Sequence, residues 1–351
     1  MLPPDPNPLL GTTYHAIGAG SAALCYAPQR HLYKWSWQTY WLVQAAGCWL
    51  IFPWIFAWAT VPELRAVLHE APGDAMLKSY LLGAVYGVGG IAFGVAIRHI
   101  GYSLTYALAI SISCVLGTLL PPFLAGKLGE TLASSAGMLV IAGVLLGGAA
   151  MVVTGYAGFR RERESAGDAN RSPFNARLGL PIVALAGVLS AVFSFALAAA
   201  QPVADVAAKH GAGHFQGNVI YLFSNTGAFT TTLAYVGWLA TRGRTWGEFF
   251  RTPDGAGLAR NYFLSGLTGL LWYLQFFFYG LGHVRMGRFE FSSWAIHMII
   301  LILLSCGFGV AIGEWKSARP ATRTLVFASI ALLLGAVGLI SYGNTLATAA
   351  H

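Results

Sequence analysis

Ten long apolar runs constrain this chain more than any other feature of its sequence. Each run holds about 18 to 25 residues, which is the helix length needed to cross a hydrocarbon core of about 30 Å. Backbone polar groups in lipid must bond within their own segment, so runs of this length predict transmembrane helices. The predicted spans are 9–28, 37–60, 76–97, 102–124, 134–156, 178–200, 217–240, 258–282, 291–312 and 324–344.

Composition supports the same class of protein. Of the 351 residues, 56% are hydrophobic and 10% are charged, and the mean hydropathy is +0.61. A soluble domain of this size would carry about a quarter charged residues. The net charge of +8 is spread over short loops, so membrane topology explains it better than a nucleic-acid partner does. The sequence therefore predicts an all-α integral membrane protein surrounded by membrane lipid.

Lys and Arg are divided unevenly between alternate loops. The odd-numbered connections, counted together with the span ends that adjoin them, hold 15 of the 21 basic residues, and the termini hold none. Because loops that stay in the cytoplasm carry an excess of Lys and Arg, the odd-numbered loops are expected there. We therefore expect a multi-pass protein of the bacterial inner membrane with both termini in the periplasm.

The two halves of the chain resemble each other. Residues 18–27 of the first span and 187–196 of the sixth share the pattern G-x-x-S-A-x-x-x-[YF]-A. Residues 83–101 and 269–287 share a glycine at each end and an aromatic residue three positions after the first glycine. Because five is an odd number, a second five-helix copy enters the membrane in the opposite sense. The pattern thus predicts ten transmembrane helices as two inverted five-helix repeats, an architecture of many secondary transporters.

A polar stretch separates the two predicted copies. The segment RRERESAGDANR lies between the fifth and sixth spans and has the composition of a loop. We therefore predict a first five-helix repeat at 1–160, a cytoplasmic linker at 161–177 and a second five-helix repeat at 178–351.

Histidines are the groups best placed to titrate inside the predicted spans, because every Asp and Glu falls in a loop or near a span end. His15 and His297 each lie about two turns into a span, and Glu290, Trp294 and His297 follow helical spacing on one face. An ionisable residue inside a span indicates function, and imidazole titrates in the physiological range. We predict proton or substrate handling by His15 and His297, with Glu290 as a proton carrier or orienting group. The structural alternatives are a histidine bonded to a backbone carbonyl and a solvated helix cap.

The sharpest local feature is WYLQFFFY at 272–279. Trp272, Gln275 and Tyr279 share one helical face with Thr268 one turn earlier. A sugar packs its C–H faces on aromatic rings and needs a donor and an acceptor for its hydroxyls, and Gln supplies both. This face therefore predicts a sugar-binding surface, and the alternative for Gln275 is a hydrogen bond between helices. Gln44 is equally open to either role.

Other classes of site find no support in the sequence. The glycines at 87–90 lie within an apolar run instead of following a soluble strand, and the chain has no P-loop motif. We therefore predict no cofactor, no metal site and no enzyme activity. A membrane enzyme would bring several acid, base or metal groups together, and a sensor would carry a soluble output domain.

These motifs resemble the L-rhamnose/proton symporter family, a branch of the drug/metabolite transporter superfamily. The resemblance covers nearly the whole chain, and the string WYLQFFFYGLGH is its most specific part. It rests on His15 with IGAGSAALCYAP (17–28), KWSW (34–37), IRHIGYS (97–103), GTLLPP (117–122), LSAVFSFA (189–196), WYLQFFFYGLGH (272–283), SW (293–294), HM (297–298) and EW (314–315).

The resemblance implies inward symport of L-rhamnose or a related 6-deoxyhexose with protons, by alternating access in a ten-helix fold. The substrate-binding residues expected from the residues and the resemblance are Trp272, Gln275, Tyr279, His15, Tyr26, His297 and Trp294. Gly90, Ala92 and Gln38 depart from the asparagines and the glutamate expected in the family, which bears on the identity of the sugar. The alternative is a drug/metabolite-type carrier for a different sugar or metabolite.

Overall fold

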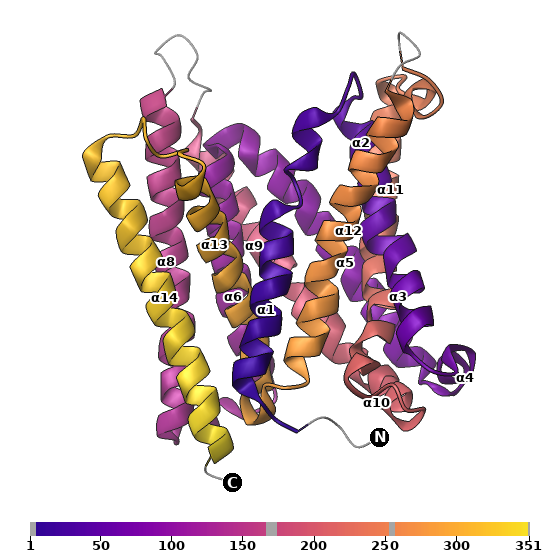
Figure 1. The fold of residues 1–351 in the computed structure, drawn as a ribbon, viewed down its shortest axis with the longest axis vertical. Helices are drawn as coiled ribbons and strands as arrows, with labels where there is room; N and C mark the ends of the chain where they lie inside the picture. The colour runs from indigo at the N-terminus through magenta and orange to yellow at the C-terminus, as the bar shows by residue number, and fades with distance from the viewer. Residues whose placement is uncertain (1–4, 166–173, 253–256, 350–351) are drawn as a thin grey trace. The chain divides into compact units, whose positions relative to one another are not determined.

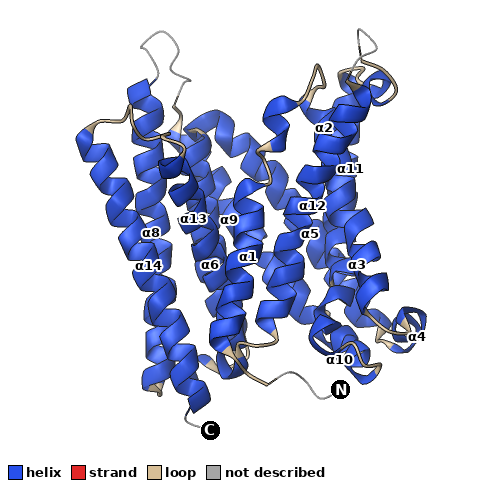
Figure 2. Ribbon diagram, viewed as in Figure 1, coloured by secondary structure: helices blue, strands red, loops and turns tan. Residues whose placement is uncertain are grey.

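The chain is helical throughout the part that the computed structural model describes, which is residues 5–165, 174–252 and 257–349, and these residues form no β-strand (Figure 2). Each of the ten predicted apolar runs overlaps a helix. The long helices are α1 (Pro8–Leu24), α2 (Trp37–Ala46), α3 (Phe52–Thr60), α5 (Gly73–Ile100), α6 (Tyr102–Leu124), α8 (Ser135–Ser165), α9 (Ala176–Ala199), α11 (Tyr221–Arg242), α12 (Leu258–His283), α13 (Ser293–Ala311) and α14 (Pro320–Ala349).

Short segments join or extend these helices. They are the helices α4 (Leu64–Glu70), α7 (Leu128–Leu132) and α10 (Gln201–Lys209), the 3-10 segments η1 (Pro28–His31), η4 (Gly213–Val219), η5 (Trp246–Phe249) and η6 (Gly287–Ser292), and the π-helical turn η2 (Gly47–Ile51). The turn η2 joins α2 to α3, so this predicted span is one continuous helical rod with an inserted π turn.

Among the described residues, seven helical segments are long and apolar enough to cross a membrane, judged by length and composition. They are Trp37–Thr60, Gly73–Ile100, Ser103–Leu124, Ser135–Glu164, Ala176–Lys209, Gly287–Ala311 and Pro320–Ala349. The predicted spans 9–28, 217–240 and 258–282 are helices outside this set. α1 has 17 residues, while α11 and α12 carry polar side chains such as Asn225 and Gln275 that lower their hydropathy.

The described helices group into two compact units. Unit 1 comprises residues 21–88 and 195–281, and unit 2 comprises residues 5–20, 89–194 and 282–349, each within the described ranges. Each unit therefore combines segments from both halves of the chain. α1, α5, α9 and α12 each pass from one unit into the other.

Glycine sets the contact between α5 and α11 inside unit 1. A Cβ on Gly83 would lie 2.0 Å from the carbonyl oxygen of Ser224, and a Cβ on Gly227 would lie 2.0 Å from that of Tyr80. No real Cβ approaches backbone so closely, so the two helices meet backbone to backbone only because both positions lack a side chain. Small residues allow this kind of close packing in membrane helices.

α12 meets α2 in a closely similar way. A Cβ on Gly269 would lie 2.7 Å from the carbonyl oxygen of Gln44 and 3.3 Å from the Cα of Gly47. Gln44, whose carbonyl is contacted, and Gly47 are three residues apart. In α11 the corresponding residues, Ser224 and Gly227, are also three residues apart. The two pairs thus share the spacing of their glycines, but only the α5–α11 contact is reciprocal, because a Cβ on Gly47 would lie 3.6 Å from the Cα of Gly269.

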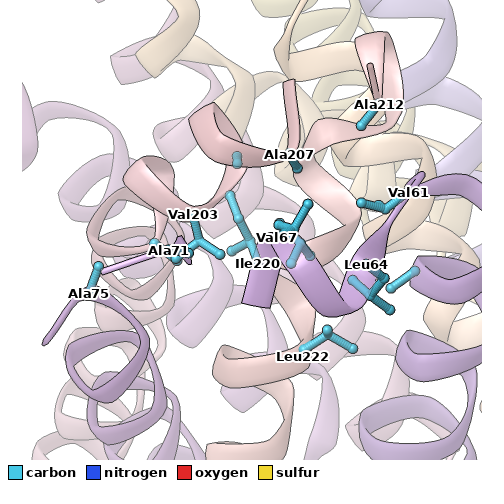
Figure 3. Close-up of a cluster of buried hydrophobic side chains, with 14 residues drawn as sticks. Val61, Leu64, Val67, Ala71, Ala75, Val203, Ala207, Ala212, Ile220 and Leu222 are labelled. Carbon is cyan, nitrogen blue, oxygen red and sulfur yellow. The ribbon is translucent and has the colours of Figure 1, made fainter. Parts of the chain in front are cut away.

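A second part of the unit 1 core lies beneath two short helices, α4 and α10, which lie side by side (Figure 1). Both present apolar side chains to the end of α3 and the start of α11, and Figure 3 shows these side chains converging. The buried cluster comprises Ala57, Val61, Leu64, Val67, Ala71, Ala75, Ala200, Val203, Ala204, Ala207, Ala212, Val219, Ile220 and Leu222.

The same two short helices are joined at their surface by His210, which follows α10. Its Nδ1 lies 2.8 Å from a carboxylate oxygen of Glu63 and its Nε2 lies 2.9 Å from one of Glu70. An ionised carboxylate only accepts hydrogen bonds, so both ring nitrogens donate when both acids are ionised, and the ring is then an imidazolium. The hydrogen bonds to Glu70 and Glu63 raise the pKa of His210 above its ordinary value.

We expect His210→Gln to lower thermal stability in acidic buffer and to have little effect in alkaline buffer. A folded-state pKa above the unfolded value means that the stabilisation is fully present below the unfolded value of about 6.5 and is lost as the pH rises through the raised value. Thermal unfolding of the detergent-solubilised protein at about pH 6 and about pH 9 measures this difference. His69→Gln on α4, where the side chain is exposed, is the control and should behave like the wild type at both pH values. An equal loss of stability at both pH values in His210→Gln would contradict this account.

In unit 2, α14 lies along α8 (Figure 1), and charged side chains at the end of α8 reach the segment before α14. Arg161 binds the carboxylate of Glu314 at 2.6 Å, and its guanidinium lies 4.8 Å from the centre of the Trp315 ring. The predicted linker 161–177 therefore begins with residues of α8, which continues to Ser165. Residues 166–173 of that linker lie outside the described residues.

Candidate functional site

Unit 1 contains a cluster of aromatic rings centred on Trp272 of α12. The ring centroid of Trp272 lies 5.7 Å from that of Tyr26, 5.6 Å from that of Trp41 and 5.2 Å from that of Trp49, each in an edge-to-face arrangement. These rings come from the turn after α1, from α2 and from η2. Trp37, which stacks on Trp41 at 5.0 Å, extends the group. We call Tyr26, Trp37, Trp41, Trp49 and Trp272 the aromatic cluster.

The motif WYLQFFFY divides between two faces of α12, as its spacing predicts. Tyr273 is fully buried, with its ring 5.0 Å from that of Phe56 and 6.4 Å from that of Tyr221. Trp272, by contrast, is only half-buried. One face of α12 therefore holds the helix in unit 1, and the other carries the residues predicted to bind sugar.

Gln275 and Thr268 are buried polar groups on the predicted sugar-binding face. Gln275 is 7% exposed, and within the described part of the chain its side chain makes no hydrogen bond. The Thr268 hydroxyl is also buried without a hydrogen-bond partner. A buried polar group without a partner costs about 1–3 kcal/mol, which applies to the Thr268 hydroxyl. The amide of Gln275 keeps its donors and its acceptor available beside Trp272. Tyr279, one turn further on, is 8% exposed.

Two further buried polar residues, Gln44 and Asn225, have different surroundings. Gln44 of α2 is fully buried, and its Oε1 accepts a hydrogen bond from Nε2 of Gln29. Asn225 of α11 is also fully buried, and its Oδ1 accepts a long hydrogen bond from the Ser224 hydroxyl at 3.5 Å. Gln44 therefore joins the neighbourhood of the aromatic cluster, whereas Asn225 bonds within its own helix.

Unit 2 brings the two predicted histidines together. His15 of α1 and His297 of α13 have ring centroids 5.8 Å apart with an interplanar angle of 74°. They are 0% and 2% exposed. A Cβ on Gly282 would lie 2.9 Å from Nε2 of His15 and 2.8 Å from the carbonyl oxygen of Gly11, so the glycine leaves room for the His15 ring. The two histidines are far apart in the sequence, and the fold buries them side by side in unit 2.

Trp294 and Glu290, which precede His297 in the chain, have partners of their own. Trp294 is 5% exposed and its Nε1 donates to the carbonyl oxygen of Ser113 at 3.0 Å, which ties α13 to α6. Glu290 lies in the 3-10 segment η6, directly after Phe289, whose backbone is non-helical, and the α-helix that carries His297 begins at Ser293. Glu290 is exposed in η6, and its backbone carbonyl bonds the ring of His283 instead.

Sequence reasoning did not identify Gln29 or the tryptophans of α2 as part of a site. The signal was present in the spacing of Trp37, Trp41 and Trp49 along one predicted helix, at intervals of four and eight residues. Across the residues that the structure describes, no group of three or more His, Cys, Asp or Glu side chains could hold a metal ion.

Comparison with known proteins gives one consistent family. The L-rhamnose-proton symport protein (RhaT) family matches this chain over residues 6–346. The L-rhamnose-proton symporter of Mannheimia succiniciproducens is 32% identical over 337 residues, covering 94% of this chain and 97% of that protein. The L-rhamnose-proton symporters of Cronobacter sakazakii and Yersinia pestis are 30% and 32% identical, covering 95% and 94% of this chain and 97% of each relative.

Proposed function

The chain belongs to the L-rhamnose-proton symport protein family, and from this premise we propose that it carries L-rhamnose or a related 6-deoxyhexose into the cell together with protons. It is a multi-pass membrane protein, and its family consists of transporters and not of enzymes. The alternative of a carrier for an unrelated metabolite is not favoured, because three relatives that match almost the full chain are all named as symporters of the same sugar.

One observation of the structure carries the sugar-binding half of this proposal. Trp272 is half-buried in the aromatic cluster, and Gln275 on the same face has an amide that no described residue satisfies. Aromatic faces suit the C–H surface and the C6 methyl group of a 6-deoxyhexose, and the amide suits its hydroxyls. We propose Trp272, Gln275, Tyr279 and Tyr26 as the sugar-binding residues. Trp294 remains a weaker candidate because its N–H group is bound to Ser113.

The imidazole pair His15–His297 supports the proton-coupling half. Two positive charges with ring centres 5.8 Å apart in a buried, low-dielectric site repel each other strongly, so the pair is expected to hold one excess proton at most. Coupling requires that the proton and the sugar favour the same conformation, because each ligand then raises the affinity of the protein for the other ligand. Glu290 stays a proposed accessory group that acts from the exposed segment before α13.

We further propose ten transmembrane helices arranged as two inverted five-helix repeats, with alternating access as the transport mechanism. The glycine contacts support this arrangement. α5 and α11 are the third and seventh predicted spans, and α12 and α2 are the eighth and second, so each pair joins one span of each repeat. A pseudo-two-fold repeat exchanges these pairs. The boundaries 1–160 and 178–351 for the two repeats remain as proposed from the sequence.

The basic residues of the loops support the proposed location. With 15 of the 21 Lys and Arg in the odd-numbered connections and the span ends that adjoin them, the positive-inside rule favours the bacterial inner membrane with both termini in the periplasm. Cysteine labelling from outside the cell at each terminus tests this orientation.

Transport by proteoliposomes tests the function directly. We expect an inward proton gradient to drive accumulation of L-rhamnose, and L-rhamnose added outside without a gradient to draw protons into the vesicle lumen. L-Mannose, which adds one hydroxyl at C6, should be accumulated at least about tenfold more slowly, because the extra polar group loses hydrogen bonds to water when it enters the aromatic cluster. Protein-free vesicles are the control. Accumulation of fucose, lyxose or a non-sugar metabolite without accumulation of rhamnose would refute the substrate assignment.

A further inference from the structure

Two glutamines meet beside the aromatic cluster of unit 1. Nε2 of Gln29, in η1, donates a hydrogen bond to Oε1 of Gln44, in α2. Each glutamine lies three residues beyond a ring of the cluster, and those two rings, Tyr26 and Trp41, are stacked with centroids 6.5 Å apart and an interplanar angle of 13°. The same two segments are therefore in contact twice, through the rings of Tyr26 and Trp41 and, about one turn later in each segment, through the amides of Gln29 and Gln44.

The two amides differ in what remains available. Gln44 is 0% exposed and its Nε2 is buried without a hydrogen-bond partner. Gln29 is half-buried, and its contact with Gln44 is the one hydrogen bond of its side chain within the described residues. An amide offers two N–H donors and one carbonyl oxygen, so Gln29 keeps one donor and its acceptor for another partner.

The burial of Gln44 is explained if it fixes the amide of Gln29. A fully buried glutamine with an unmet N–H is unfavourable compared with an apolar side chain of the same size. Within the described residues, the one hydrogen bond of the Gln44 side chain is to Gln29. This bond restricts the rotation of the Gln29 side chain, which otherwise has several rotatable bonds. A fixed amide recognises a hydroxyl better than a mobile one, because less conformational entropy is lost on binding.

We infer that Gln29 forms a hydrogen bond to one ring hydroxyl of the bound sugar and thereby contributes to substrate specificity, with Gln44 as the residue that positions it. A hydroxyl both donates and accepts, which matches the remaining N–H and carbonyl oxygen of Gln29. The inference rests on the proposed sugar transport and deepens it, because it assigns a hydroxyl-reading residue that lies outside α12. Gln275 on α12 then serves a different hydroxyl.

The test is a set of binding measurements in which both the side chain and the sugar are altered. Purified wild type, Gln29→Ala and Gln29→Met are titrated calorimetrically with L-rhamnose and with analogues that lack the hydroxyl at C2, C3 or C4. Gln29→Met keeps the length of the side chain and removes only the amide, so it stays informative if alanine disturbs η1. Gln201→Ala is the matched control, since Gln201 bonds Asp205 within α10.

We expect Gln29→Ala and Gln29→Met to weaken L-rhamnose binding about three- to tenfold, the usual effect of losing one hydrogen bond. One deoxy analogue should bind the wild type about three- to tenfold more weakly than L-rhamnose does. Its affinity should not fall further in either Gln29 variant, because the hydroxyl that it lacks is the partner of Gln29. Gln44→Leu should weaken rhamnose binding less, and it should have no further effect when Gln29 is already alanine. Gln201→Ala should bind every sugar as the wild type does.

The contrary results are separable. If the wild type binds rhamnose and every deoxy analogue loses the same factor in both Gln29 variants, Gln29 has only a structural role and the inference is wrong while sugar transport stands. If the wild type binds none of these sugars at any pH, the proposed function fails and the inference fails with it.

Discussion

Replacement of His297 by glutamine is expected to abolish proton-coupled accumulation of rhamnose while leaving passive exchange of the sugar across the membrane. Glutamine keeps a polar side chain of similar size, but it cannot carry a proton, and His297 is one of two imidazoles buried in contact in unit 2. With one proton per sugar, a pH difference of one unit supplies about 1.4 kcal/mol and supports about tenfold accumulation. We expect that ratio to fall to about one in His297→Gln, as measured with labelled rhamnose in proteoliposomes.

The same experiment distinguishes coupling from a loss of folding. Counterflow of labelled rhamnose against unlabelled rhamnose needs no proton gradient, so it should persist in His297→Gln if the fold is intact. His15→Gln should give the same pattern because the two rings share one buried site. His69→Gln, an exposed histidine on α4, should accumulate rhamnose as the wild type does. Full proton-coupled accumulation in both His297→Gln and His15→Gln would eliminate the imidazole pair as the proton site.

Hydropathy predicted the helices of this chain well, but it identifies membrane spans least clearly for helices that carry the proposed functional residues. The predicted spans 9–28, 217–240 and 258–282 are helical but fall outside the seven segments that meet the apolar criterion. Two of them carry His15 and Gln275, and both side chains are buried in the structure. α1 falls outside the set because it has 17 residues, whereas polar side chains lower the hydropathy of α11 and α12. A criterion of length and apolar composition therefore passes over helices that carry proposed functional residues.

The candidate site was only partly predictable because helical spacing describes one helix at a time. It placed Trp272 and Gln275 on one face of α12 correctly, and it could not show that Trp41 and Trp49 of another helix pack against that face. Such contacts depend on how helices pack, which a single sequence does not determine. The alignment of Glu290 with His297 stays a prediction, because the backbone before α13 is 3-10 and not α-helical, which changes the angular spacing of side chains there.

Replacement of Gly227 by alanine is expected to impair folding more than a methyl group added at any other glycine of α11. The new Cβ would lie 2.0 Å from the carbonyl oxygen of Tyr80 and 2.7 Å from the backbone nitrogen of Ala84, so no rotamer change relieves the overlap. α11 would have to move away from α5, which breaks the reciprocal contact at Gly83. Overpacking usually costs about 1–3 kcal/mol when side chains can adjust, and backbone overlap should exceed that range. Thermal unfolding and size-exclusion profiles in detergent measure the loss.

The matched control lies on the same helix. Gly237→Ala adds the same methyl group to α11, where the nearest atom would be 3.8 Å away in the Trp246 ring. Alanine favours a helix over glycine by about 1 kcal/mol, so this variant should be as stable as the wild type or slightly more stable. Gly269→Ala, at the corresponding contact of α12 with α2, should be destabilised as Gly227→Ala is, because its Cβ would lie 2.7 Å from a backbone oxygen. Equal stability of Gly227→Ala and Gly237→Ala would show that α5 and α11 do not pack through glycine, and it would remove the main structural support for the inverted repeat.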